Sequence, residues 1–362
     1  MNKQVKSDPV VRAAAWLLLI GLVLAFMILG QQILIPLTWA LVFAFILFPF
    51  CDWLEKKGIG RTWSSLIATI IFTILSGVIL FYLVYQSVRI LQQEGAIYGT
   101  IMDAYNSARA WFYDRLGMEV FDPEEGAQLG ADSLGRVINF AAREISSIGK
   151  NVVTISLIPM FLFFLLLYRG LAMKFTRTRY EGKNLEQLEN FFHRSQYSIQ
   201  NYLWGTLILT GITSAMAFVI LLLFGIKYAF FFGIFIGILN LIPYIGNLAA
   251  FVVVLLFVFV TQKDIGTTLF CGFALYAANL VQENVLRPKL VGDKMEMNAM
   301  MVFTGVIVGG MIWGFSGMVL FIPILGILKS LFDSDPDLHV YSIFFDSDSS
   351  MPDKGENPPD DG

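Results

Sequence analysis

Charged residues are scarce in this chain. They make up 15% of it, compared with about 25% in a typical soluble domain, and mean hydropathy is +0.68. Seven stretches contain no charged residue at all: 13–51, 62–88, 151–168, 195–226, 228–262, 265–282 and 297–328. A membrane-spanning helix needs about 20 apolar residues. The composition therefore predicts an all-α, polytopic transmembrane protein with about eight membrane segments.

Several kinds of chemistry lack the residues that they require. The two cysteines, Cys51 and Cys271, lie in or beside apolar stretches, so they form no disulfide framework and no metal-ligand pattern. The chain has no phosphate-binding Gly-x-x-x-x-Gly-Lys-Ser/Thr loop, which excludes a self-contained ATPase. It also has no catalytic constellation and no basic, aromatic patch for nucleic acid. We therefore expect no enzyme activity, no metal, no cofactor and no nucleic acid partner.

Basic residues alternate with the predicted spans as the positive-inside rule requires. Lys and Arg precede the first span and recur at 56–61 and 169–194, whereas the segment between the third and fourth spans is acidic. This alternation predicts that both termini are cytoplasmic. In 13–51, Gln31, Gln32 and Pro36 predict a tight turn between two spans, near Gly30. The predicted parts are N-terminal membrane helices (1–91), a helical extracytoplasmic insertion (92–149), a C-terminal membrane bundle (150–332) with a cytoplasmic amphipathic segment (169–202), and a disordered acidic tail (333–362).

The uncharged stretch 228–262 is interrupted by Asn240-Leu-Ile-Pro-Tyr-Ile-Gly-Asn247. Proline removes a backbone donor and glycine relaxes backbone restrictions. At membrane depth, broken backbone is tolerated only inside protein or beside a water-filled cavity. The interruption therefore predicts a transport path. Either a hairpin or one kinked span fits 228–261, and the hairpin is favoured because it leaves Arg287, Lys289 and Lys294 on the cytoplasmic side.

The stretch 297–328, with its glycines and Pro323, poses the same alternative. Its Ile322-Pro-Ile-Leu-Gly326 repeats the form of Ile242-Pro-Tyr-Ile-Gly246, and paired proline-interrupted segments are a pointer to transporter sites. The glycines allow either close helix packing or a hinge. The predicted path residues are Asn240, Pro243, Tyr244, Gly246, Asn247, Gln282, Glu283, Asn284, Pro288 and Pro323.

Each polar candidate has a plainer alternative. Asn240 and Asn247 either bind a solute or satisfy the backbone groups that Pro243 leaves free. Glu283 either takes part in transport, as intramembrane carboxylates often do, or pairs with Arg287 one helical turn later.

The motif Asn240–Gly246, followed by Gln282-Glu-Asn-Val-Leu-Arg-Pro-Lys-Leu-Val-Gly292, resembles the autoinducer-2 exporter family of bacterial membrane proteins, the PerM-like permeases. The resemblance covers about 10–330. The resemblance implies about eight membrane helices with cytoplasmic termini, in a transporter of the bacterial inner membrane. Members of the family are linked to autoinducer-2 export or to sodium–proton antiport. The chain departs from the family pattern at Asn247, where a proline is usual, and at Asn298-Ala299, where His-Pro is common. These departures leave the substrate open.

Three functions are therefore compared. The first is a transporter that exports a small solute, such as an autoinducer-2-like signal or a metabolite. The second is a cation–proton antiporter, for which only Glu283 is suitably placed. The third is a non-transporting scaffold that acts through 92–148 and 169–194. The interruption at 240–247 is polar but uncharged, which favours a neutral or weakly charged solute. The expected partners are a small molecule or ion and the lipid bilayer, and the sequence leaves open whether the chain forms a homo-oligomer.

Overall fold

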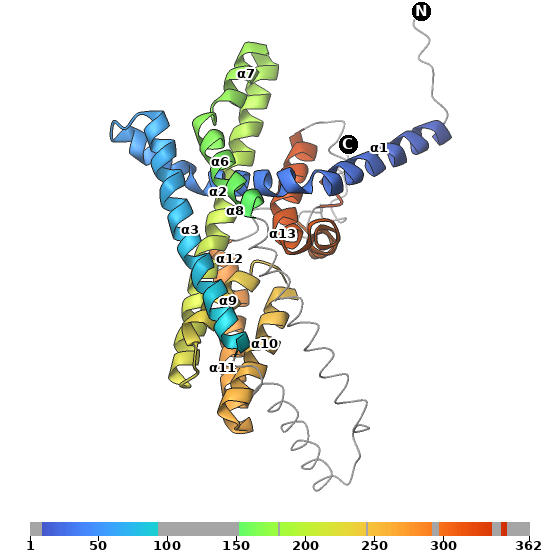
Figure 1. Cartoon of the computed structure of the whole chain (residues 1–362). Coiled ribbons are helices and arrows are strands. Elements are labelled where there is room, and N and C mark those ends of the chain that lie inside the picture. The colour runs from blue at the N-terminus through green and yellow to red at the C-terminus, as the bar shows by residue number, and fades with distance from the viewer. Residues whose placement is uncertain are drawn as a thin grey trace, which may run out of the picture.

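A computed structural model describes residues 9–92, 152–179, 182–243, 245–291, 297–334 and 342–345. Its elements are α-helices and one π-helical turn, arranged as in Figure 1. The bounds are α1 (Pro9–Leu29), α2 (Gln31–Lys56), α3 (Arg61–Gln92), α6 (Val152–Leu167), α7 (Leu171–Arg179), α8 (Gly182–Leu223), α9 (Ala229–Leu239), α10 (Ile245–Gln262), α11 (Ile265–Val281), η1 (Gln282–Leu286), α12 (Arg287–Leu290) and α13 (Ala299–Ser334). The predicted all-α architecture is confirmed. The proposed insertion beyond residue 92, nearly all of the tail 333–362 and Tyr244 lie outside the described residues.

Six helices in these ranges are long and apolar enough to cross a membrane: Gln31–Lys56, Arg61–Ile90, Ile199–Leu223, Ile245–Gln262, Ile265–Leu290 and Ala299–Lys329. Three shorter apolar helices accompany them: Leu17–Leu29, Ser156–Leu167 and Ala229–Leu239. The chain is thus a multi-pass membrane protein. The expected number of about eight membrane segments is approximate, because some of these helices are too short to cross alone.

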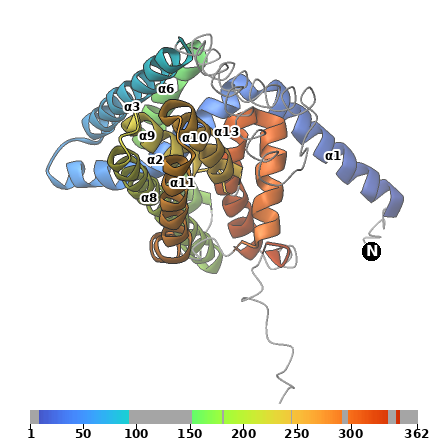
Figure 2. The same cartoon turned by 90° about the horizontal axis from the view of Figure 1, so that it is seen from below.

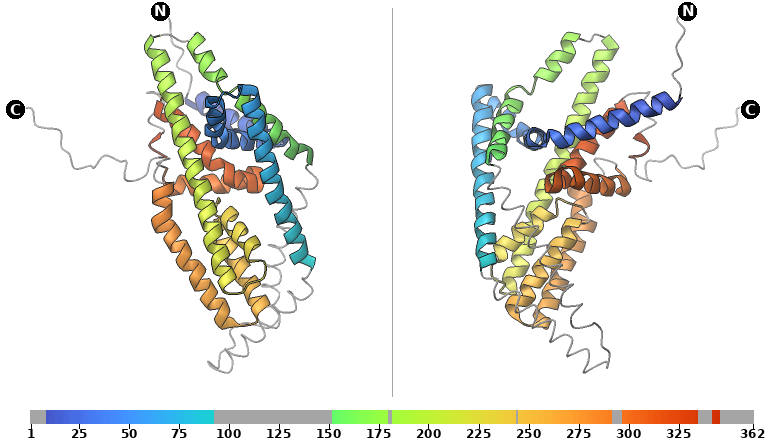
Figure 3. Two further views of the ribbon diagram at one scale, coloured as in Figure 1. Left: turned by 90° about the vertical axis from the view of Figure 1, so that its left-hand side faces the viewer. Right: turned by 45° about the vertical axis from the view of Figure 1, so that its right-hand side comes forward.

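The longest described helix, α8, joins the amphipathic segment to the membrane bundle. At 1.5 Å per residue, its 42 residues span about 63 Å, roughly twice the hydrocarbon thickness of about 30 Å. The amphipathic stretch that begins this helix therefore continues directly into the predicted fifth span. Figure 3 shows α7 and the start of α8 at one end of the molecule, and the α8–α9 and α10–α11 connections at the other.

An ion-pair cluster joins two connections at the end where α7 lies. The Arg169 guanidinium, after α6, lies 3.0 Å from an Asp52 carboxylate oxygen and 2.8 Å from a Glu55 carboxylate oxygen, both on α2. The guanidinium of Arg61, which begins α3, lies beside Gly170. The α2–α3 and α6–α7 connections, which are both rich in cations, therefore meet at one end, as the alternation of charges predicts.

The chain does not reverse near Gly30, and the predicted tight turn there is wrong. Gly30 N–H donates to the Phe26 carbonyl (2.8 Å) and Leu34 N–H donates to the Gly30 carbonyl (2.9 Å), so helical bonding runs through the junction. α1 leads away from the other helices in Figures 1 and 2. Pro36 lies inside α2, where one missing N–H and a local bend can be accommodated when neighbouring helices satisfy the backbone.

The interruption at 240–247 separates α9 from α10, and the two helices pack against each other as a hairpin. α9 has 11 residues and is about 16 Å long, so it reaches only part of the way across a bilayer. Any side chain at Gly246 would collide with the Leu239 carbonyl, so only glycine allows α10 to start this close to the end of α9. The preferred hairpin is confirmed, and α11 then runs antiparallel to α8.

The second predicted hairpin is also present, and its turn lies at Trp313 and Gly314. α13 is interrupted at Trp313 and at Gly314, whose φ of 58° and ψ of −138° suit glycine alone. Its two arms pack closely where Gly309 faces Gly317. Gly314 thus forms the turn and the facing glycines allow close packing, while a hinge at these glycines stays a prediction. The turn is attached to the N-terminal helices because the Trp313 indole N–H donates to the Met27 carbonyl (3.0 Å).

The two hairpins meet through their apolar residues. Ile242, in the turn of the first, packs with Val306 and Ile322, one from each arm of the second. In both views of Figure 3, α13 accordingly lies beyond the turn of the α9–α10 hairpin. The repeated Ile-Pro motifs are therefore neighbours but not equivalents, because Pro243 lies in a turn whereas Pro323 lies inside a helical arm.

Candidate functional site

A π-helical turn positions the polar cluster at the end of the uncharged stretch 265–282. α11 continues into η1 (Gln282–Leu286) and then α12 without a break. Pro288, near the start of α12, lacks the N–H that an α-helix would use, and the helix ends two residues later at Leu290. A π-helical turn inserts an extra residue and is frequent at functional sites. Here it turns Gln282 into the protein, where the residue is 2% exposed.

Gln282 connects three elements through its amide. Its oxygen accepts a hydrogen bond from the Thr213 hydroxyl of α8 (2.8 Å). Its nitrogen donates to the Asn240 side-chain oxygen at the end of α9 (3.0 Å) and to a Glu283 carboxylate oxygen (3.1 Å). All four residues carry a buried or half-buried polar side chain at membrane depth, where unpaired polar groups are costly. Gln282 is therefore the central residue of this network.

Asn247, at the start of α10, forms a second connection to α11. Its side-chain nitrogen donates to the Asn279 oxygen (3.2 Å) and to a Glu283 carboxylate oxygen (3.3 Å). Asn240 and Asn247 thus attach both sides of the hairpin turn to α11 and η1.

The backbone of the interruption is satisfied by its own groups. Ile242 N–H donates to the Leu239 carbonyl (2.9 Å), Ile245 N–H to the Pro243 carbonyl (2.7 Å) and Gly246 N–H to the Ile242 carbonyl (3.1 Å). The turn therefore does not need the two asparagine side chains for these bonds. These bonds therefore do not support the alternative in which Asn240 and Asn247 satisfy the backbone groups that Pro243 leaves free.

Glu283 is paired, as its plainer alternative requires. Its carboxylate lies 2.7 Å from the Arg287 Nε, and the other carboxylate oxygen accepts from Arg287 Nη2 (2.9 Å). The two side chains are 36% and 32% exposed. This ion pair, which includes one hydrogen bond, neutralises Glu283 while leaving it able to accept the amide bonds of the network.

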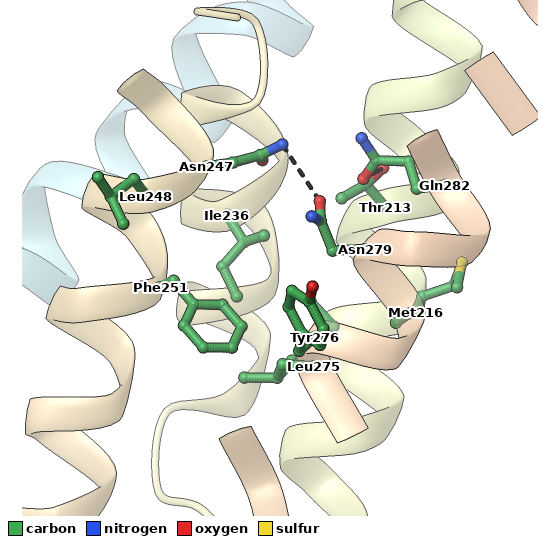
Figure 4. A pocket seen from close by; sticks show the side chains of 12 residues that line it. Thr213, Met216, Ile236, Asn247, Leu248, Phe251, Leu275, Tyr276, Asn279 and Gln282 are labelled. Atoms are coloured by element: carbon green, nitrogen blue, oxygen red, sulfur yellow. Dashed lines mark hydrogen bonds between the residues drawn. The ribbon is translucent and has the colours of Figure 1, made fainter. Parts of the chain in front are cut away.

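A cavity of about 440 Å³ lies next to this network, between α8, the α9–α10 hairpin and α11 (Figure 4). Its volume is within the range of about 300–1,000 Å³ that is usual for small-molecule sites. It is lined by Thr213, Met216, Ala217, Ile236, Asn247, Leu248, Phe251, Leu275, Tyr276, Ala278, Asn279 and Gln282. Among the described residues, no group of three or more His, Cys, Asp or Glu side chains could hold a metal ion.

The structure brings together only some of the predicted path residues. Asn240, Asn247, Gln282 and Glu283 share one network, and Asn247 and Gln282 also line the cavity. Pro243 and Gly246 shape the turn without lining the cavity, while Tyr244 lies outside the described residues.

Three other predicted residues lie away from this site. The Asn284 side chain is exposed and donates to the Leu280 carbonyl of its own helix (2.9 Å). Pro288 is exposed, and Pro323 is buried in the second arm of α13. The structure thus does not bring these three residues to the cavity, because sequence proximity to the motif does not determine which face of a helix a residue occupies, and their part in a transport path stays a prediction.

The prediction missed two polar residues of the site. Asn279 lies three residues before Gln282, and this helical spacing indicated a shared face of α11. Thr213 had no comparable signal, because one hydroxyl in the apolar stretch 195–226 is most simply bonded to its own helix. Its hydroxyl indeed also lies 2.8 Å from the Leu209 carbonyl.

Comparison with known proteins agrees with this architecture. The family model described as "AI-2E family transporter" matches residues 16–335. Putative transport protein YrrI of Bacillus subtilis is 23% identical over 316 residues, which cover 84% of this chain and 87% of the relative. Putative permease PerM of Escherichia coli K12 is 25% identical over 345 residues, covering 91% and 95%. A Putative transport protein of Methanothermobacter thermautotrophicus is 26% identical over 314 residues, covering 82% and 87%. The chain therefore belongs to the AI-2E transporter family, and it is a multi-pass membrane transporter.

Proposed function

We propose that this transporter exports a small, uncharged solute, either an autoinducer-2-like signal or another metabolite, through the cavity beside the α9–α10 hairpin. The observation that carries the proposal is the meeting of a broken hairpin, a π-helical turn and a cavity around uncharged amides. Discontinuous helices near mid-membrane are the usual place for solute sites in secondary transporters.

The hairpin is held to α11 and η1 by a few neutral or charge-assisted hydrogen bonds. The side-chain bonds join Asn240 to Gln282, and Asn247 to Asn279 and Glu283. Interhelical bonds of this kind contribute about 0.6 kcal/mol each inside a membrane protein, so three of them contribute roughly 2 kcal/mol. A solute that bonds the same amides can replace them at little net cost, which supports movement of the hairpin as the step that changes access to the cavity.

The orientation of the chain in the membrane is proposed from the distribution of its cations. The cationic connections at the α7 end would face the cytoplasm under the positive-inside rule, and both termini would then be cytoplasmic in a bacterial inner membrane. The cations that support this orientation are Lys56, Lys57, Arg61, Arg169, Lys174 and Arg177.

Cation–proton antiport is the second candidate, because Glu283 lies within the candidate span Ile265–Leu290. The ion pair between Glu283 and Arg287 argues against antiport, because a carboxylate that exchanges a proton for a cation must first lose its counter-charge. Loss of pH-dependent sodium efflux from inverted vesicles in Glu283→Gln, with the neutral solute still exported, would favour antiport.

Export profiling of cells tests the main proposal. We would compare the deletion strain with strains that express the wild type, Asn247→Ala, or the matched control Asn284→Ala, whose side chain lies outside the cavity. The expected result is a solute that is depleted from the medium in the deletion strain and restored by the wild type and the control only. Equal restoration by Asn247→Ala would refute the site, and no depleted solute would refute export.

A further inference from the structure

The cavity has two chemically different ends. In Figure 4 the amides of Asn247, Asn279 and Gln282 gather toward one end, and Phe251 and Leu275 lie toward the other. The polar end offers both donors and acceptors, because an amide carries an oxygen and an NH₂ group. The apolar end offers mainly hydrocarbon and aromatic rings, and the hydroxyl group of Tyr276 lies between it and the amides. A ligand that fills the whole cavity must therefore be amphiphilic.

None of the lining side chains carries a charge at neutral pH. The nearest carboxylate, Glu283, is paired with Arg287 and already accepts bonds from Asn247 and Gln282. Burying an ionised group without a counter-charge is far costlier than burying a hydrogen-bonded neutral one. The cavity therefore discriminates against anions and cations alike.

Two lining residues reach the outer surface of the bundle. Leu248 on α10 is 69% exposed and Tyr276 on α11 is 51% exposed. Both lie within candidate membrane spans, Ile245–Gln262 and Ile265–Leu290. Exposed surface in such spans faces hydrocarbon, so the mouth of the cavity between α10 and α11 opens toward the bilayer.

The volume limits the size of the ligand. Liquid water occupies about 30 Å³ per molecule, and a cavity of about 150 Å³ holds benzene. A cavity of about 440 Å³ therefore holds up to roughly 15 to 18 non-hydrogen atoms.

We propose that the cavity binds an uncharged amphiphile of this size, with an apolar body and one amide or hydroxyl end, which enters from the bilayer between α10 and α11. The inference rests on the proposed function and narrows it, because it selects a partly apolar metabolite over a strongly hydrophilic, autoinducer-2-like signal. The apolar body lies against Phe251 and Leu275, and the polar end bonds to Asn279 and its neighbours.

Binding to the purified full-length protein in lipid nanodiscs tests the ligand class. Three probes of similar size separate the alternatives: 4-phenylbutyramide, its anionic isostere 4-phenylbutyrate, and the polyol sorbitol. We expect saturable binding of the amide above the level of empty nanodiscs, at least tenfold weaker binding of the carboxylate, and no binding of sorbitol. Equal binding of the amide and the carboxylate, or binding of sorbitol in preference to the amide, would overturn the proposal. This outcome needs only the wild-type protein.

Two variants test the polar end and the mouth. Asn279→Leu should weaken binding of the amide at least tenfold, whereas Asn284→Leu, outside the cavity, should leave it unchanged. Leu248→Trp should slow association of the amide severalfold, whereas Leu269→Trp, on an exposed part of α11 that does not line the cavity, should not. Unchanged binding in Asn279→Leu would refute the polar end, and an unchanged association rate in Leu248→Trp would refute the lateral mouth.

The binding test and the export test fail separately. If the amide binds but export profiling finds no solute, the cavity assignment stands and the proposed function fails. If the exported solute is a polyol and the amide does not bind, the proposed function stands and the ligand class fails.

Discussion

Replacing Gln282 by methionine removes the central residue of the polar network with little change in side-chain volume. The Gln282 side chain makes bonds to Thr213, Asn240 and Glu283, at 2.8, 3.0 and 3.1 Å. At about 0.6 kcal/mol for each bond inside a membrane protein, their loss costs roughly 2 kcal/mol. Asn240 is 5% exposed, and an acceptor left unsatisfied at such a site costs about 1–3 kcal/mol. We therefore expect Gln282→Met to lower the free energy of unfolding by about 3–5 kcal/mol.

The assay is reversible unfolding of the purified protein in bicelles, followed by steric trapping or by titration with dodecyl sulfate. Asn284→Met is the matched control, because Asn284 lies two residues away with an exposed side chain that, among the described residues, bonds to the Leu280 carbonyl of its own helix. A surface substitution of this kind should stay within about 0.5 kcal/mol of the wild type. If Gln282→Met lost no more stability than Asn284→Met, the network would not hold the hairpin as argued.

A double-mutant cycle isolates the bond between the hairpin and η1. Asn240→Leu should cost less in the Gln282→Met background than in the wild type, because the partner of Asn240 is already absent. Contacting residues of this kind couple by about 0.5–3 kcal/mol. Additive effects of the two substitutions would show that the 3.0 Å contact contributes nothing.

Two further predictions concern the turns that position the membrane helices. Gly314→Ala forces alanine into a conformation with φ 58° and ψ −138° and should destabilise the protein by about 1–3 kcal/mol. The control is Gly211→Ala in α8, where an added Cβ meets nothing within 4 Å, and this substitution should be neutral or stabilising. Equal unfolding temperatures of the two variants would contradict a strained turn at Gly314. Asp264, the N-cap of α11, accepts hydrogen bonds from the Thr267 side chain, the Thr267 N–H and the Gly266 N–H, which lower the pKa of its carboxyl group. A lowered pKa in the folded state means that this stabilisation is present above about pH 4, the ordinary value for the group, and is lost as the pH falls through the lower folded value. Asp264→Ala should therefore lower Tm at pH 7, and the difference from the wild type should narrow at pH 3; a constant difference would refute this linkage.

Local chemistry was enough to predict much of the architecture. Long uncharged stretches predict membrane helices because a charge in hydrocarbon is costly. The alternation of cations predicted that the α2–α3 and α6–α7 connections meet at one end, and the Arg169 ion pairs agree with it. The position of Arg287 and Lys289 favoured a hairpin at 228–261 over a kinked span, and the contacts between α9 and α10 confirm it.

One local prediction failed, and one likeness between motifs did not extend to the structure. Gln31, Gln32 and Pro36 were expected to accompany a reversal of the chain near Gly30, whereas Ile322-Pro-Ile-Leu-Gly326 only repeated the form of the motif at Pro243. The structure instead keeps Pro36 and Pro323 inside helices. A proline in a membrane helix need not end it when packed neighbours satisfy the freed carbonyl, and those neighbours are not visible in the local sequence.

The sequence alone determined that this is a helical membrane protein with a polar, uncharged interruption at 240–247, because hydropathy, proline and glycine act on the chain locally. Tertiary structure decided what the interruption does. Only the packing of α8, α9, α10 and α11 brings Thr213, Asn240 and Gln282 within hydrogen-bonding distance and leaves a cavity beside them. The partners of Gln282 lie 69 and 42 residues away along the chain, and no local pattern encodes such a meeting.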